Sequence, residues 1–170
     1  MTTSATEEND AYDVVVVGYG PVGAVLAGLL GQQGVRTLVV ERDVEVYRLP
    51  RAVHLDGETV RIFQALGLAD EVVASARPIT AYEFVTAKRE TLIRYDTPSG
   101  VTDDGFGSDY LFHQPSLERS LRATVAAAPS VEVELGSEVT HLEEGEAGVQ
   151  ERQQGVHPTV GVHGVKGSRR

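Results

Sequence analysis

Residues 14–23 read VVVVGYGPVG, and this stretch decides the fold. Its four consecutive valines are typical of a strand that is buried on both faces of a parallel sheet. The glycines at 18, 20 and 23 follow the strand directly and fit the pattern GxGxxG. A buried strand that passes through such a turn into a helix predicts the first half of a Rossmann-like β-α-β unit.

The helix and the strand after the glycines complete this unit. Residues 21–33 predict a helix that ends at Gly34, a left-handed C-cap, and residues 35–40 predict a second strand that ends at Glu41. We expect one face of the helix to carry an apolar stripe made by Val22, Leu26, Leu29 and Leu30. The fold class is therefore α/β with a parallel sheet.

Each part of the glycine pattern has a physical task at a dinucleotide. Gly18 allows the tight turn, Gly20 lets backbone amides approach a pyrophosphate, and Gly23 allows close packing of helix and strand. Glu41 can accept hydrogen bonds from ribose hydroxyls and would repel a 2′-phosphate, which favours FAD or NAD over NADP. Two alternatives stay open from the spacing alone: a tight turn with no ligand, and NAD in place of FAD.

The remaining chain predicts mixed α and β elements. Helices are expected over residues 56–66 and 70–76, an antiparallel strand pair over 79–86 and 91–95, and a helix capped by Ser116. A strand at 131–135 follows, with 137–142 beside it. We predict a disordered leader at 1–11, one α/β domain at 12–142, and an irregular tail at 143–170, where the apolar residues have no period.

Composition excludes several classes of protein. The 170 residues carry 15 Lys and Arg against 25 Asp and Glu, a net charge of −10, which argues against a nucleic-acid partner. The chain has no Cys, so disulfides, thiolate zinc sites and thiol nucleophiles are excluded, and no His pair has metal-ligand spacing. We expect a cytoplasmic protein without a membrane segment, because residues 1–10 lack the features of a signal peptide and glycines interrupt the uncharged run at 14–31.

Three further segments carry a family resemblance. Residues 50–53 read PRAV before a predicted helix that ends in ALGL at 65–68, and residues 112–115 read FHQP at the start of another helix. Together with residues 14–42, they resemble the FAD-dependent aromatic-ring hydroxylases, most closely the group of 3-(3-hydroxyphenyl)propionate hydroxylases. The resemblance runs in order over residues 12–142.

The resemblance implies roles for individual residues. It places Gly18, Gly20, Pro21, Val22 and Gly23 over the FAD pyrophosphate, Glu41 and Arg42 at the adenosine ribose, Arg51 and Ala52 at the flavin side, and Gln114 in contact with the cofactor. The side chains permit these roles, since Arg offers a fixed charge with a fork of donors and Gln offers both a donor and an acceptor. The alternatives are a solvated charge at Arg51 and an ordinary helix-start residue at Gln114.

The resemblance also implies the reaction. Such enzymes are monooxygenases that hydroxylate a small aromatic substrate with O2 and with NADH or NADPH as reductant. The family has two later signatures, an Asp-Gly segment and a Gly-Asp segment, and this sequence has no good match to either. We therefore expect an incomplete domain that corresponds to the N-terminal part of a hydroxylase. No catalytic residue is assigned. A noncatalytic dinucleotide-binding remnant and an NAD-dependent dehydrogenase are the competing interpretations.

Overall fold

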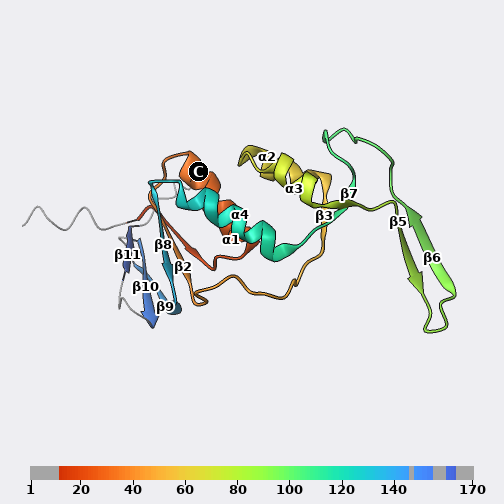
Figure 1. Ribbon diagram of the computed structural model, residues 1–170. Coiled ribbons are helices and arrows are strands. Elements are labelled where there is room, and N and C mark those ends of the chain that lie inside the picture. Colours follow the sequence, from red (N-terminus) through yellow and green to blue (C-terminus); the bar gives the residue numbers. More distant parts are fainter. Residues whose placement is uncertain (1–11, 146–147, 155–159, 164–170) are drawn as a thin grey trace, which may run out of the picture. The chain divides into compact units, whose positions relative to one another are not determined.

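A parallel three-stranded sheet is the centre of the first part of the molecule. The computed structural model describes residues 12–145, 148–154 and 160–163. Strands β1 (Val14–Val17), β2 (Thr37–Glu41) and β8 (Val131–Leu135) lie in the order β1-β2-β8, and both pairs are parallel (Figure 1). The central strand is buried along most of its length at Leu38, Val39 and Val40. The predicted Rossmann-like β-α-β core is therefore confirmed.

Helix α1 (Pro21–Gln32) connects β1 to β2, and it buries small residues rather than the predicted leucine stripe. Ala24, Ala27 and Gly28 are buried, whereas Val22 is 83% and Leu26 is 45% exposed. The stripe was a wrong prediction because the helix packs very closely on its surroundings: a Cβ at Gly31 would lie 2.7 Å from that of Ala128. Gly34 ends the helix with a φ of +70°, as predicted.

An antiparallel sheet occupies part of the segment that was predicted to be an irregular tail. Strands β9 (Glu138–Gly145), β10 (Gly148–Gln154) and β11 (Val160–His163) lie in the order β11-β10-β9. The prediction of no regular structure after residue 142 is wrong for these strands, because backbone groups pair whether or not the side chains alternate in polarity. β9 also pairs with β10 and not with β8. The predicted leader, 1–11, lies outside the described residues, as do 146–147, 155–159 and 164–170.

The chain divides into two compact units, and the second comprises Tyr47–Leu121, while Met1–Val46 and Arg122–Arg170 form the first. The helices of the second unit are α2 (Gly57–Ala65), α3 (Ala69–Ser75) and the first part of α4 (Gln114–Ala126). The first two confirm the predicted helices. In the described part of the chain, no helix is long and apolar enough to cross a lipid bilayer.

Short strands, which no sequence pattern predicted, position the loops of the second unit. β3 (His54–Asp56), β7 (Asp109–Leu111) and β4 (Arg77–Pro78) form an antiparallel sheet in the order β3-β7-β4. Leu55 and Tyr110 face each other in this sheet, and both side chains are buried. Strands of two or three residues are too short to show a period in the sequence.

The predicted antiparallel pair is present as a separate hairpin. β5 (Ala81–Val85) pairs with β6 (Thr91–Asp96), drawn in green in Figure 1, with Tyr82 opposite Tyr95. On the exposed surface of this hairpin, Arg94 forms ion pairs with Glu83 at 2.6 Å and Asp96 at 2.8 Å. Exposed ion pairs of this kind contribute little to stability.

Candidate cofactor-binding site

The glycine loop between β1 and α1 is built by backbone geometry. Gly18 has a φ of +100°, which side chains rarely adopt, and its N–H donates to the Val40 carbonyl at 2.8 Å. A Cβ at Gly23 would lie 2.0 Å from the Gly18 carbonyl oxygen, so no larger residue fits there. These two glycines fix the turn as the sequence predicts.

Gly20 has a different role, because the space around it is open. A Cβ built on Gly20 meets no protein atom within 4 Å, and its φ of −74° is available to any residue. Gly20 is also the N-cap of α1, and no side chain caps the helix and no acidic residue lies in its first turn. The N–H groups at this helix end are therefore left for an anion, which fits the pyrophosphate of a dinucleotide. Val22, 83% exposed in the first turn, borders the same helix end.

Glu41 lies at this loop, as the spacing predicts. Its Oε2 accepts a hydrogen bond from the Tyr19 N–H at 2.7 Å, and its Oε1 accepts one from the Asp43 N–H at 2.9 Å. A carboxylate has about four acceptor positions, so both oxygens retain capacity for ribose hydroxyls. The neighbouring Arg42 is exposed, and its Nε lies 3.8 Å from the carboxylate of Asp43.

Two residues that the sequence did not single out hold the middle of the loop. The Tyr19 side chain is buried, and the Arg122 guanidinium stacks on its ring at 4.6 Å and donates to the Tyr19 carbonyl at 3.3 Å. Burial raises the pKa of Tyr19 to about 12, so its hydroxyl stays neutral at ordinary pH. Neither residue has a sequence signal, because Tyr19 occupies a variable position of the pattern and Arg122 lies far along the chain. The Nε of Arg122 is buried without a hydrogen-bond partner.

The second predicted cofactor segment, Arg51 and Ala52, is held by a single side chain. The Oε1 of Gln114 accepts hydrogen bonds from the Arg51 N–H at 2.8 Å and from the Ala52 N–H at 2.7 Å. The side chain of Arg51 remains exposed, and its guanidinium lies over the Tyr47 ring at 5.2 Å. The structure thus brings together three of the predicted residues in the second unit.

Gln114 is not an ordinary exposed helix-start residue. It is the first residue of α4, it is buried, and its Nε2 donates to the Oε1 of Glu118 at 2.7 Å. The helix begins at Gln114 and not after Ser116, so the predicted cap at Ser116 is wrong. The Ser116 hydroxyl instead lies 2.9 Å from the Nδ1 of His113. Because the Gln114 carbonyl is occupied, only the second hydrogen on Nε2 is left for a cofactor.

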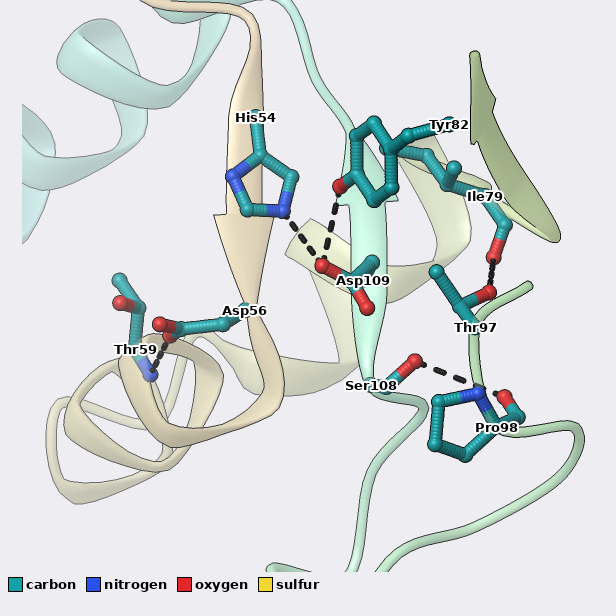
Figure 2. A network of polar contacts seen from close by, with 9 residues as sticks. All are labelled: His54, Asp56, Thr59, Ile79, Tyr82, Thr97, Pro98, Ser108 and Asp109. Atoms are coloured by element: carbon teal, nitrogen blue, oxygen red, sulfur yellow. Dashed lines mark hydrogen bonds and ion pairs between the residues drawn. The ribbon is translucent and has the colours of Figure 1, made fainter. Parts of the chain in front are cut away.

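A polar network fixes the strand that follows this loop (Figure 2). The Oδ1 of Asp109 on β7 accepts a hydrogen bond from the Tyr82 hydroxyl at 2.9 Å and lies 2.8 Å from the Nε2 of His54 on β3. Burial raises the pKa of Asp109, but hydrogen bonds from Ser108, His54 and Tyr82 outweigh it and leave the pKa below its usual value. Burial, and then the hydrogen bond to Asp109 and the negative charge of that carboxylate, raise the pKa of Tyr82 to about 12.

Asp56, drawn in the same view, caps helix α2, which begins one residue later than predicted. Its Oδ1 accepts from the Thr59 N–H at 2.7 Å at the N-terminus of α2, which lowers the pKa of Asp56. No group of three or more metal-binding side chains occurs among the described residues.

Comparison with known proteins gives this geometry a context. Residues 11–162 match the family described as FAD binding domain. A 3-(3-hydroxyphenyl)propionate/3-hydroxycinnamic acid hydroxylase of Mycobacterium sp. (strain JLS) is 40% identical over 154 residues, which is 90% of this chain and 27% of that protein. A protein of Rhodococcus jostii (strain RHA1), named as a probable NADH-specific resorcinol 4-hydroxylase, is 38% identical over 79% of this chain and 25% of its own length.

Solved structures agree with the sequence matches. The p-nitrophenol 4-monooxygenase PnpA of Pseudomonas putida aligns over 91% of this chain and 39% of its own, with a TM-score of 0.77 and 25% identity. The flavin-dependent monooxygenase PieE, solved with FAD and substrate, has the same TM-score and 29% identity over 91% of this chain and 29% of its own. The chain thus spans about a quarter of the length of the curated relatives it matches.

Proposed function

This chain belongs to the FAD-binding-domain family, and from that premise we propose that it is the FAD-binding part of a flavin-dependent monooxygenase that hydroxylates a phenolic ring. Its relatives include proteins named as hydroxylases of hydroxyphenylpropionate and of resorcinol. The aromatic substrate, O2, and NADH or NADPH as reductant belong to this proposal. So does a cytoplasmic location, which the absence of Cys supports.

One observation carries the proposal: the uncapped N-terminus of α1 beside the open space at Gly20. In the proposal, Gly18, Gly20, Pro21, Val22 and Gly23 surround the FAD pyrophosphate. Glu41 and Arg42 bind the adenosine ribose. The carboxylate of Glu41, fixed by the Tyr19 N–H, disfavours a 2′-phosphate at that place.

The second loop supplies the flavin side of the proposed site. Arg51 and Ala52 contact the flavin part of FAD, and Gln114 contributes its remaining N–H. When bound, FAD supplies the redox chemistry of oxygen transfer to the ring, and the protein supplies binding and orientation. The residues of this chain hold and position the cofactor, and none of them is assigned a proton or oxygen transfer.

The choice of FAD over NAD is supported by the family and by the arrangement around Arg51. An NAD-dependent dehydrogenase would need the glycine loop and Glu41 but not a second loop that a buried glutamine holds in place. FAD binding to the purified chain should be measured by quenching of flavin fluorescence, with NAD as competitor. Saturable FAD binding that NAD competes with only weakly supports the proposal, whereas tight NAD binding without FAD binding contradicts it.

Turnover separates an active hydroxylase from a noncatalytic binding module. Oxidation of NADH should be followed with the FAD-loaded chain in the presence of 3-(3-hydroxyphenyl)propionate or resorcinol. Aromatic-dependent NADH oxidation would exclude the noncatalytic alternative for this chain. FAD binding with no such oxidation would limit its function to holding the cofactor.

A further inference from the structure

A buried carboxylate lies behind the second loop. Glu118 is only 2% exposed, and it sits one helical turn after Gln114 on α4. Glutamate is rarely buried to this extent unless it has a partner. Its partner here is the Nε2 of Gln114 at 2.7 Å, within the range of a charge-assisted hydrogen bond.

The chemistry of this pair removes an ambiguity of the glutamine. A carboxamide has one accepting end and one donating end, and a rotation about its last bond exchanges them. A carboxylate only accepts, so Glu118 requires the NH2 group of Gln114 on its side. The carbonyl oxygen of Gln114 must then face the loop, where it accepts from Arg51 N–H and Ala52 N–H.

We propose that Glu118 is a positioning residue that sets the orientation of the Gln114 amide and, through it, the conformation of the Arg51–Ala52 loop. If the amide were reversed, its NH2 group would face two N–H donors and its carbonyl would face a carboxylate. Both contacts would be repulsive, and two loop donors would lose their acceptor. Glu118 therefore favours the one arrangement that holds the loop.

This arrangement decides what the loop can offer to a ligand. The N–H groups of Arg51 and Ala52 are occupied, so they are not available as an anion-binding pair. The exposed Arg51 guanidinium is the cationic group that the fixed loop presents. In the proposed function this guanidinium contacts FAD, and only that step of the inference rests on the proposed function.

Amide hydrogen exchange of the 170-residue chain tests the positioning role without any cofactor. Arg51 and Ala52 are exposed, so their hydrogen bonds to Gln114 are the main protection of their amides. We expect Glu118→Leu and Gln114→Ala to lower the protection of these two amides by about tenfold or more. Glu118→Gln can pair with either orientation of Gln114, so it should lower the protection by about threefold.

The control variant is Glu58→Gln, which removes the same charge from an exposed position in the same unit. It should leave both amides as protected as in the wild type. Unchanged protection in a folded Glu118→Leu variant would overturn the proposal. If Glu118→Leu does not fold, the test rests on Glu118→Gln, which conserves the size of the side chain. Unchanged protection of the Arg51 and Ala52 amides in Glu118→Gln would equally overturn the proposal.

FAD titration of the same variants separates this inference from the proposed function. If the wild type binds FAD, Glu118→Leu and Gln114→Ala should lose more FAD affinity than Glu118→Gln, in parallel with their loss of amide protection. Glu58→Gln should bind FAD as tightly as the wild type does. If the wild type does not bind FAD, the proposed function fails, but the exchange result still decides the role of Glu118. Loss of FAD affinity in Glu118→Leu with full amide protection would assign Glu118 another role and contradict the proposal.

Discussion

The two loops predicted to bind the cofactor are fixed in opposite ways. The glycine loop of the first unit is fixed by close backbone contacts, with Gly23 against the Gly18 carbonyl. The Arg51–Ala52 loop of the second unit is fixed by the side chain of Gln114, which accepts hydrogen bonds from both N–H groups of the loop. Gln114 lies 63 residues after Arg51 and 62 residues after Ala52. The conformation of the first loop should therefore be disrupted by a larger side chain at Gly23, and that of the second loop by removal of the Gln114 side chain.

Gly23→Ala should have the largest effect. The added Cβ would lie 2.0 Å from a backbone oxygen, which cannot move without distorting β1 or α1. We expect a loss of about 1–3 kcal/mol in the free energy of unfolding and about a 100-fold loss of FAD affinity. Urea unfolding and flavin fluorescence measure the two effects, and a variant as stable as the wild type would show that the loop is not closely packed.

Gly20→Ala should separate binding from stability. Its Cβ meets no protein atom, so the free energy of unfolding should fall only by the cost of an alanine at the N-cap of α1, about 1 kcal/mol or less. The same methyl group would occupy the space proposed for the pyrophosphate, so FAD affinity should fall about tenfold or more. Equal FAD affinity in this variant and the wild type would place the pyrophosphate elsewhere.

Arg122→Ala should weaken the glycine loop to a smaller degree. It removes the contact with the Tyr19 ring and the hydrogen bond to the Tyr19 carbonyl. A cation–π contact contributes about 0.5–1 kcal/mol at exposed sites and about 2 kcal/mol when desolvated. Because this contact is partly buried, we expect a loss of about 1 kcal/mol, which corresponds to about a fivefold loss of FAD affinity. Arg122→Lys keeps the charge but not the planar stacking group, and it should recover only part of the loss. Full recovery would assign the effect to charge alone.

Asp109→Asn should have the smallest effect, a loss of stability at neutral pH that disappears as the pH falls. The pKa of Asp109 is lowered in the folded state, so its ionised form stabilises the fold above the unfolded pKa of about 3.9. That stabilisation is lost as the pH falls through the folded pKa, when Asp109 is protonated beside His54, Tyr82 and Ser108. Urea unfolding between about pH 5 and pH 2 should show a flatter decline in the variant. An equally steep decline would assign the acid sensitivity to other carboxylates.

The difference between the loops also explains what the sequence can predict. The glycine loop, Glu41 and the parallel strands were predicted because their residues are close in sequence and each type has a local geometric task. The role of Gln114 in holding the loop, and of Tyr19 and Arg122, was not predicted, because each depends on a partner far along the chain. The buried face of α1 was predicted wrongly because close packing selects Ala24 and Ala27 over the larger leucines.

Strands β9 to β11 show a further limit of prediction. Residues 137–142, most of β9, were predicted as a strand, but the glycines and glutamines between 145 and 155 lack an apolar period, so the sequence offered no signal for β10. The order of the three strands in the sheet is set by backbone pairing. The family match extends over this segment to residue 162. The predicted domain end at 142 remains a prediction.

The most direct test of the central claim is to follow the backbone amides of the labelled chain by NMR while FAD is added, with ADP as a comparison. We expect ADP to shift the amides of residues 18–20, of Val22 and Gly23, and of Glu41, and to leave those of Arg51 and Ala52 unchanged. FAD should shift both sets at the same concentration. Shifts at the glycine loop alone with both ligands would contradict the claim, because they would show that the second loop does not take part in FAD binding.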